Sequence, residues 1–279
     1  MKLVTHHGVR CHFTPFICKW PLKPNFFKFI HKKLFSGSKK TLPKIIKTSE
    51  ILDYMGSGKL PKAAMSWSSG KDSSMALYET IKSGKFEIVT LLTTVNSDYD
   101  RVSMHGVRNE LLHKQSELSG FPVLEAKIPA KSSNEIYQKA MQKAIDELKK
   151  LGVEYMIFGD IFLQDVRDYR IKMMTGTGIE PIFPLWGRNT SKLALEIIDS
   201  GIKARISCLD PRKLPTSLGG AEFNRDLLNH LPENVDPCGE NGEFHTFVYS
   251  APFFREPMKI KNGESVLRDN FYFTDLEKY

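Results

Sequence analysis

Short apolar segments alternate with longer amphipathic ones between residues 63 and 160. The apolar segments predict strands: AAMSW (63–67), FEIVTLLTTV (86–95), FPVLEAKI (121–128) and VEYMIFGD (153–160). Between them, apolar residues at helical spacing predict helices over 73–83, 107–120 and 132–152. This alternation predicts a parallel sheet. Ligands of such sheets bind beyond the carboxyl ends of the strands, where the loops 68–73, 95–106 and 159–170 lie.

The best-defined helix, over 132–152, has Ser133 in the N-cap position and Gly152 after its last turn. The alternating pattern ends near residue 165. A helix over 190–201 precedes a strand over 202–208, and the C-terminal stretch reads as short antiparallel strands. We therefore expect three parts: a basic extension over 1–60, a nucleotide-binding α/β domain over 61–165, and a smaller α+β domain over 166–279.

The net charge of +8 is unevenly distributed. Residues 1–62 contain 13 Lys and Arg but only two acidic residues, whereas the rest of the chain has 27 basic and 30 acidic ones. If the protein binds a nucleic acid or an anionic membrane surface, we expect the basic N-terminal arm, and not the folded part, to make the contact. A solvated extension is the favoured reading of this arm. No segment is apolar enough to span a membrane, and the four cysteines lack zinc-site spacing. These features predict a cytoplasmic protein.

The stretch SSGKDS (68–73) lies between the first strand and the first helix. Its hydroxyls, the flexible Gly70, the charge of Lys71 and the helix N-terminus together suit a phosphate group. The nearby Gly56-Ser57-Gly58-Lys59 is not a Walker A loop, because Leu60 stands where a Ser or Thr would bind Mg²⁺.

SSGKDS resembles the S-G-G-K-D-S loop of the ATP pyrophosphatase (PP-loop) superfamily, with Ser69 replacing a glycine. We expect Ser69 to be tolerated if its φ is negative. Four further motifs resemble the diphthine–ammonia ligase family, also called adenine nucleotide α-hydrolase-like: MHGVR (104–108), FGDIFLQDVRDYR (158–170), PIFPLWG (181–187) and VDPCGENGEFHTFVY (235–249). The resemblance covers residues 63–279 and implies a Rossmann-like (HUP) fold.

The resemblance also implies the reaction: a substrate carboxylate attacks the α-phosphorus of ATP, pyrophosphate leaves, and ammonia displaces AMP from the acyl-adenylate. The implied cofactors are ATP and Mg²⁺, and the implied partners are ammonium and the diphthine of elongation factor 2. The implied catalytic residues are Lys71, Asp72, Glu243 and His245. The implied ATP-binding residues are Ser68, Ser69, Gly70, Lys71, Asp72, Ser73, Gly159 and Asp160, with Asp72 also a magnesium ligand. The implied substrate-binding residues are Glu240, Asn241, Arg108 and Arg170.

Two of these residues also have a possible structural role: Asp160 could cap a helix, and Arg170 could form a surface ion pair. Two other functions also stay open. The protein could act on another acceptor, such as a tRNA base or a metabolite, with Cys208 and Cys238 as its thiols, or it could bind adenine nucleotides without catalysis. A homodimer is compatible with the sequence.

Overall fold

The computed structural model describes residues 59–279. The extension expected over 1–60 therefore lies, except for its last two residues, outside the described residues. No helix in the described part of the chain is long and apolar enough to cross a membrane.

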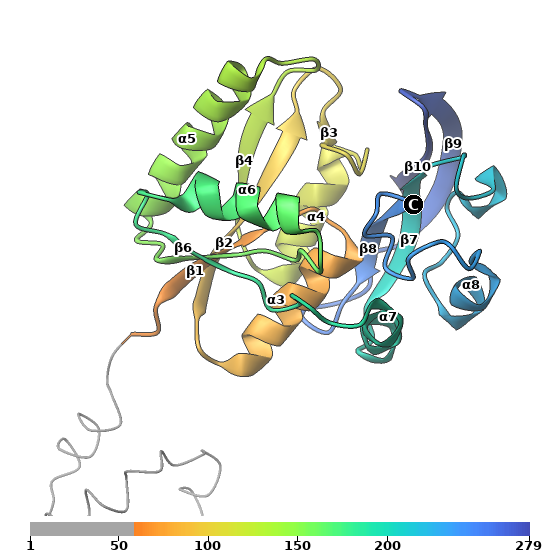
Figure 1. Ribbon diagram of the computed structural model, residues 1–279, viewed down its shortest axis with the longest axis horizontal. Helices are drawn as coiled ribbons and strands as arrows, with labels where there is room; N and C mark the ends of the chain where they lie inside the picture. Colours follow the sequence, from red (N-terminus) through yellow and green to blue (C-terminus); the bar gives the residue numbers. More distant parts are fainter. Residues whose placement is uncertain (1–58) are drawn as a thin grey trace, which may run out of the picture. The chain divides into compact units, whose positions relative to one another are not determined.

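A mostly parallel sheet forms the first half of the described chain (Figure 1). Its parallel strands, in spatial order, are β4 (Val123–Ile128), β2 (Glu87–Asn96), β1 (Lys62–Ser66), β5 (Tyr155–Ile157) and β6 (Glu180–Ile182). A two-residue strand, β3 (Arg101–Val102), pairs antiparallel with the end of β2. The predicted parallel sheet is confirmed. Strand β6 lies beyond residue 165, where the sequence pattern placed the end of the first domain, since three residues give no readable period.

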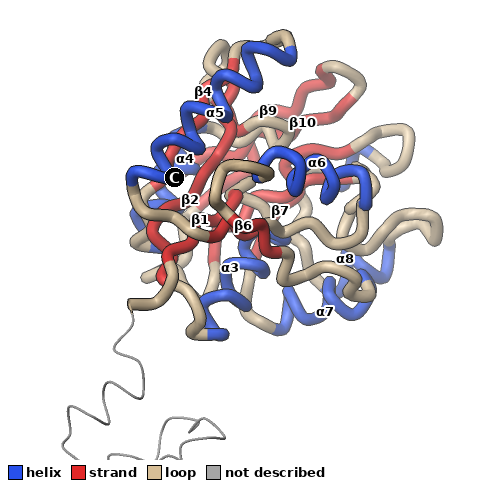
Figure 2. The backbone as a smooth tube through the Cα atoms, turned by 60° about the vertical axis from the view of Figure 1, so that its left-hand side comes forward, coloured by secondary structure: helices blue, strands red, loops and turns tan. Residues whose placement is uncertain are grey.

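Helices cover both faces of this sheet. They are α3 (Lys71–Ser83), α4 (Asn109–Ser119), α5 (Asn134–Lys150) and α6 (Gln164–Met174). Alternate residues of β1 separate the two faces: Ala63 and Met65 belong to the hydrophobic cluster that contains α3 and α4, and Ala64 to the one that contains α5 and α6. In Figure 2, α5 and α6 lie on one side of the strands and α3 on the other. The predicted N-cap of α5 is confirmed, since Ser133 Oγ accepts a hydrogen bond from the Ile136 N–H.

The second half is built around a four-stranded antiparallel sheet, in the order β8-β7-β10-β9. Its elements are α7 (Thr190–Asp199), β7 (Lys203–Leu209), the short 3₁₀ helix η2 (Thr216–Leu218), α8 (Arg225–His230), β8 (Phe244–Ser250), β9 (Ile260–Arg268) and β10 (Phe271–Lys278). The predicted fold class, a parallel-sheet α/β part followed by a smaller α+β part, is confirmed.

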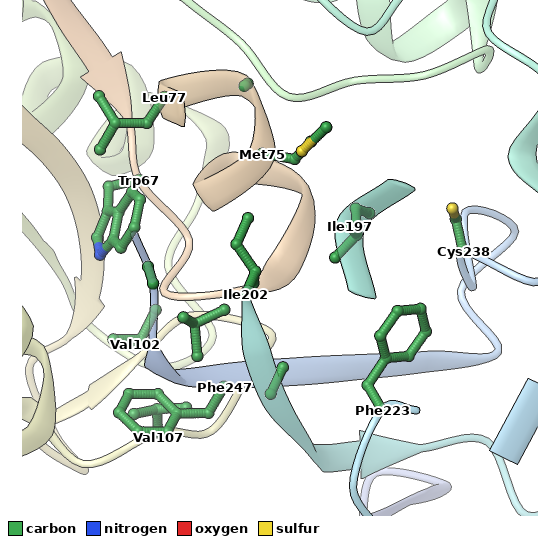
Figure 3. Packing of buried hydrophobic residues seen from close by; sticks show 14 of the residues in the cluster. Trp67, Met75, Leu77, Val102, Val107, Ile197, Ile202, Phe223, Cys238 and Phe247 are labelled. Carbon is green, nitrogen blue, oxygen red and sulfur yellow. The ribbon is translucent and has the colours of Figure 1, made fainter. Parts of the chain in front are cut away.

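One hydrophobic core joins the two halves. Met75 and Leu77 of α3 belong to the same hydrophobic cluster as Ile197 of α7, Phe247 of β8 and Phe223. Figure 3 shows these side chains around α3 and the neighbouring strands of the antiparallel sheet. All five are at most 3% exposed. The position of α3 is therefore fixed from both sheets, which determines where the loop before it lies.

Candidate functional site

The SSGKDS loop makes the turn from β1 into α3. The helix begins at Lys71, two residues before the predicted start at Ser73, because Gly70 has extended backbone and serves as N-cap. Ser69 has a φ of 69°, so the negative φ on which we made the tolerance of a serine here conditional is not found. A non-glycine residue in this left-handed region costs about 1 kcal/mol. The sharp reversal from strand to helix requires this conformation.

The hydroxyls of the loop face one another. Ser68 Oγ and Ser73 Oγ are 3.1 Å apart, and Ser73 Oγ donates to the Gly70 carbonyl at 3.0 Å. The N–H groups of the first turn of α3, which have no partner within the helix, lie beside them. Hydroxyls and a helix N-terminus at one place form a site that suits an anion.

Strand β8 holds the loop from the other half of the chain. Val248 donates its N–H to the Ser69 carbonyl at 2.9 Å, and the Lys71 N–H donates to Thr246 Oγ1 at 3.1 Å. The buried Gln115 side chain donates to the carbonyls of both Ser69 and Val248, at 3.2 and 2.6 Å. Sequence reasoning missed Thr246 and Gln115. The available signal was a glutamine on the apolar face of the helix predicted over 107–120.

A cavity of about 570 Å³ opens beyond the carboxyl ends of β1, β2 and β5. The predicted site residues that line it are Ser68, Asp72, Ser73, Gly159, Asp160, Arg170, Glu240 and His245. Its other wall is largely apolar and includes Ile128, Met141 and Phe158. One polar end and one apolar wall suit a molecule that carries both phosphates and an aromatic base.

Gly159 allows the end of β5 to lie against the start of α3. A Cβ atom at Gly159 would be 3.0 Å from the backbone of Asp72 and Ser73. Gly70 makes a similar approach possible, because its Cβ would lie 2.7 Å from the His105 ring. Both glycines are required for packing, and neither has a positive φ.

Three carboxylates, Asp72, Asp160 and Glu240, share the polar end of the cavity. Burial raises the pKa of each carboxylate; repulsion from Asp72 adds to the effect at Asp160 and Glu240, and repulsion from Asp236 adds to it at Asp72. For Glu240 the pKa rises to about 7, although its Oε1 accepts the Ile161 N–H at 2.8 Å, which opposes the shift. Glu240 is therefore poised to gain or lose a proton near neutral pH.

Lys71 does not line the cavity. Its side chain is buried, its Nζ lies 2.9 Å from Asp72 Oδ2, and it also donates to the Cys238 carbonyl. The ammonium is within 5.5 Å of the ring centroids of Phe223 and Phe244. Burial opposes its charge, but the neighbouring acidic groups, with Asp72 foremost, raise its pKa. In this structure Lys71 links the SSGKDS loop to the Cys238 loop, and its contact with phosphate stays a prediction.

Two histidines from different halves of the chain pack against each other at the cavity wall, with their ring planes tilted by 39°. The ring centroids of His105 and His245 are 4.7 Å apart. Burial lowers the pKa of His105 to about 4 and that of His245 well below its ordinary value. The neutral His105 ring donates from Nδ1 to the Thr246 carbonyl at 3.0 Å, because a carbonyl can only accept. Its Nε2 is then a hydrogen-bond acceptor.

Glu243, Asn241 and Arg108 lie outside the cavity lining. Glu243 is 1% exposed, and its Oε1 accepts from the Asp236 N–H and the Asn241 side chain, both at 3.3 Å. These contacts shape the loop that carries Glu240. Arg108 instead forms ion pairs with Asp275 and Glu277 of β10.

Arg170, which the sequence implies as a substrate-binding residue, lines the cavity. Its Nε is 3.8 Å from Asp160 Oδ2, and its guanidinium lies 5.3 Å from the centre of the Phe158 ring. The same α6 helix places Arg167 over Trp186, 4.5 Å from the ring centroid. Cation–π contacts of this kind fix the orientation of a guanidinium, so that Arg170 can face an anion in the cavity.

No group of three or more His, Cys, Asp or Glu side chains in residues 59–279 is arranged to hold a metal ion by itself. Asp72 nevertheless offers one suitable ligand, since its Oδ1 is buried without a hydrogen-bond partner among these residues. Protein-bound Mg²⁺ commonly takes one or two carboxylates together with phosphate oxygens and water. The residues therefore fit a magnesium ion that arrives with a nucleotide.

The fold and the cavity define an α/β protein with an anion-binding loop between its first strand and first helix. Comparison with known families makes this specific: the family described as "Diphthamide synthase N-terminal domain" matches residues 61–180, and "Diphthamide synthase C-terminal domain" matches residues 189–279. The chain belongs to the diphthamide synthase family, and this family uses ATP.

Relatives with low sequence identity to this chain support the same family assignment. The diphthine–ammonia ligase of Homo sapiens is 28% identical over 226 residues, which span 72% of this chain and 83% of the human protein. That of Danio rerio is 26% identical over 234 residues, 75% of this chain and 90% of the fish protein. The Schizosaccharomyces pombe enzyme matches at 23% over 218 residues, but over only 36% of its own length.

Proposed function

We propose that this protein is an ATP-dependent ligase that converts a carboxylate to an amide through an acyl-adenylate. The observation that carries the proposal is that the SSGKDS loop opens on the same cavity as Glu240 and His245. The SSGKDS loop supplies an anion site, and Glu240 and His245 come from the CGENGEFH stretch of the C-terminal half. Membership of an ATP-using family supports it.

In the first step, an oxygen of the substrate carboxylate attacks the α-phosphorus of ATP. The bond from that phosphorus to the oxygen bridging to the β-phosphate breaks, and pyrophosphate leaves with its electron pair. The hydroxyls of Ser68 and Ser73 and the N–H groups of Asp72 and Ser73 in the first turn of α3 bind the pyrophosphate part. Donors fixed in place before the reaction stabilise the charge that develops on the leaving group.

Two charged groups would assist this step. Asp72 Oδ1 would hold Mg²⁺, which supplies positive charge against the leaving pyrophosphate. We expect a bound nucleotide to draw the Lys71 ammonium away from the Cys238 carbonyl, because a phosphate oxygen is a charged and stronger acceptor. Arg170 and Asp160, which line the same cavity, would also contact the nucleotide.

In the second step, the nitrogen of ammonia attacks the acyl carbon, and the bond from that carbon to the AMP oxygen breaks. Ammonia arrives mainly as ammonium, which the carboxylates Asp72, Asp160 and Glu240 would attract. With a pKa of about 7, Glu240 can accept the proton that the nitrogen must lose. The neutral rings of His105 and His245 would accept hydrogen bonds from the remaining N–H groups.

Diphthine is our first candidate for the acceptor, because the relatives are named diphthine–ammonia ligases. A thiol-dependent transfer to a tRNA base has less support. Cys208 and Cys238 are buried, and burial raises the pKa of both thiols. Neither is suited to act as a thiolate nucleophile.

The test is to incubate the protein with ATP, Mg²⁺ and ammonium, together with elongation factor 2 that carries diphthine or with a panel of small carboxylates. We expect AMP and pyrophosphate as products, and exchange of labelled pyrophosphate into ATP when acceptor is present but ammonium is not. A product of ADP and phosphate would reject the adenylate mechanism. Binding of ATP with no turnover on any acceptor would favour a nucleotide-binding protein without catalysis.

A further inference from the structure

A second cavity, of about 290 Å³, lies between β3 and the β9–β10 hairpin. Three arginines line it: Arg101, Arg108 and Arg268. Phe273 and Gly106 form part of its floor, and they touch so closely that a Cβ on Gly106 would lie 2.5 Å from the Phe273 ring. Of the residues that line this cavity, the sequence assigns a role, substrate binding, to Arg108 alone, and the proposed reaction uses none of them.

Two of the arginines are held in place by one carboxylate. Arg101 NH1 donates to Asp275 Oδ1 and to the Gly106 carbonyl, both at 2.8 Å, and Arg108 Nε donates to Asp275 Oδ2 at 2.9 Å. The Asp275 side chain is 16% exposed, and the arginines lower its pKa despite its burial. Arg101 and Arg108 share the Asp275 carboxylate, and Arg108 NH2 also lies 3.5 Å from Glu277 Oε1, whose other oxygen pairs with Lys261.

Arg268 is the third arginine and differs from the other two. No carboxylate lies within ion-pair distance of it among residues 59–279. Its guanidinium is instead supported by aromatic rings, 5.0 Å from the centre of Tyr99 and 5.9 Å from that of Phe273. The exposed Glu264 is the remaining charged residue of the lining. The five lining charges leave an excess of one positive charge, and Arg268 has donors to spare.

The second cavity is separated from the nucleotide cavity by a single hairpin, residues 101–108. Its backbone pairing is short and regular, with a Val102 N–H to Val107 carbonyl bond of 2.8 Å. The tip contributes Met104 and His105 to the nucleotide cavity, whereas Arg101 and Arg108 at the base line the second one. A molecule at the mouth of the nucleotide cavity could reach the second cavity by passing one hairpin.

We infer that the second cavity binds an oxyanion, a carboxylate or a phosphate, that the acceptor carries in addition to its reacting carboxylate. Arg268 closes on this group, and Arg101 and Arg108 supply the fixed positive wall. Planar guanidinium groups suit oxyanions because they donate two parallel hydrogen bonds. The assignment of the oxyanion to the acceptor rests on the proposed ligase function; the anion site itself does not.

The experiment uses the full chain labelled with ¹⁵N, with the nucleotide cavity first saturated by a non-hydrolysable ATP analogue and Mg²⁺. Inorganic phosphate and glutarate are titrated separately at constant ionic strength, and the arginine Nε–H signals are followed. We expect saturable shifts with at least one of the two anions. The anion that binds more tightly identifies the acceptor group as phosphate or carboxylate.

Arg268→Ala should weaken this binding about tenfold or more, which is what the loss of a charge-assisted hydrogen bond predicts. Arg268→Lys should retain part of it. Arg255→Ala, which removes an exposed arginine elsewhere, is the matched control and should bind as the unmodified chain does. The inference is overturned if neither anion gives saturable shifts, or if Arg268→Ala binds like the control. If the site binds anions but no acceptor yields AMP, the ligase proposal fails and the anion site stands alone.

Discussion

At the scale of single residues, the cavity concentrates acidic groups that repel one another. Asp72, Asp160 and Glu240 are buried to different degrees, and only Lys71 and Arg170 lie near enough to offset them. Lys71 faces Asp72, and Arg170 faces Asp160. Glu240 therefore has no cationic partner in direct contact among the described residues, and its Oε1 accepts a hydrogen bond from the Ile161 N–H. Burial is the main reason why the pKa of Glu240 rises to about 7, and repulsion from Asp72 and Asp160 adds to it.

The raised pKa of Glu240 has a consequence for stability. Between about pH 4.5 and 7, the folded protein binds a proton that the unfolded chain has released. The free energy of unfolding should therefore fall as the pH rises through this window. Glu240→Gln removes the ionisation and should make the protein more stable than the unmodified chain at pH 8, by on the order of 1–2 kcal/mol.

The measurement is urea unfolding of both proteins at pH 5 and pH 8. The difference between the two proteins should be larger at pH 8 than at pH 5. Glu233→Gln changes an exposed glutamate nearby and serves as the control. An equal difference at both pH values would show that Glu240 does not titrate in this range.

Sequence reasoning reached some residues and missed others for identifiable reasons. The SSGKDS loop and His245 were predictable, because a short motif between a strand and a helix, or a histidine in a distinctive stretch, can be read without coordinates. The position of Arg108 could not be predicted, because its partner Asp275 is 167 residues away along the chain. The φ of Ser69 was also hidden, since the angle of the turn depends on how β8 holds the loop.

At the scale of elements, β8 does more than complete the antiparallel sheet. It carries His245 into the cavity, and Thr246 and Val248 bond to the SSGKDS loop. The strands β1, β2, β4 and β5 were predicted, because parallel strands buried on both faces give long apolar runs. Helix α6, which begins at Gln164, was instead placed in the predicted loop 159–170, and the short strands β3 and β6 were not predicted. The dependence of the loop on β8 had no local signal, because hydrogen bonds between distant segments leave no period in the sequence.

Thr246→Val tests this dependence. Valine has nearly the same shape as threonine but cannot accept the hydrogen bond from the Lys71 N–H, which is buried at the start of α3. An unpaired buried donor costs about 1–3 kcal/mol, so we expect urea unfolding to show a loss in this range. Calorimetric titration should also show weaker ATP binding, because the loop is less firmly held.

Thr246→Ser keeps the hydroxyl and should restore most of both properties. Thr274→Val, on β10, is the control for a threonine-to-valine change in the same sheet; it should leave ATP affinity unchanged. If Thr246→Val bound ATP as tightly as the unmodified chain, β8 would not be needed to shape the loop.

At the scale of the whole molecule, the two halves share one core, and the contacts that define the phosphate loop cross between them. The family comparison divides the chain into two matched segments, 61–180 and 189–279, yet Leu60–Tyr279 form one compact unit.

We therefore expect residues 60–279 to unfold in one cooperative transition. Trp67, which is 2% exposed and donates to Gln115, reports on the junction. The experiment uses a chain whose other tryptophans are replaced by phenylalanine. In urea, the change in Trp67 fluorescence should coincide with the loss of the helical circular dichroism signal. Two separate transitions would show that the halves fold independently. The cavity would then have to assemble by docking of two preformed parts, and ATP binding should raise the midpoint of the first half alone.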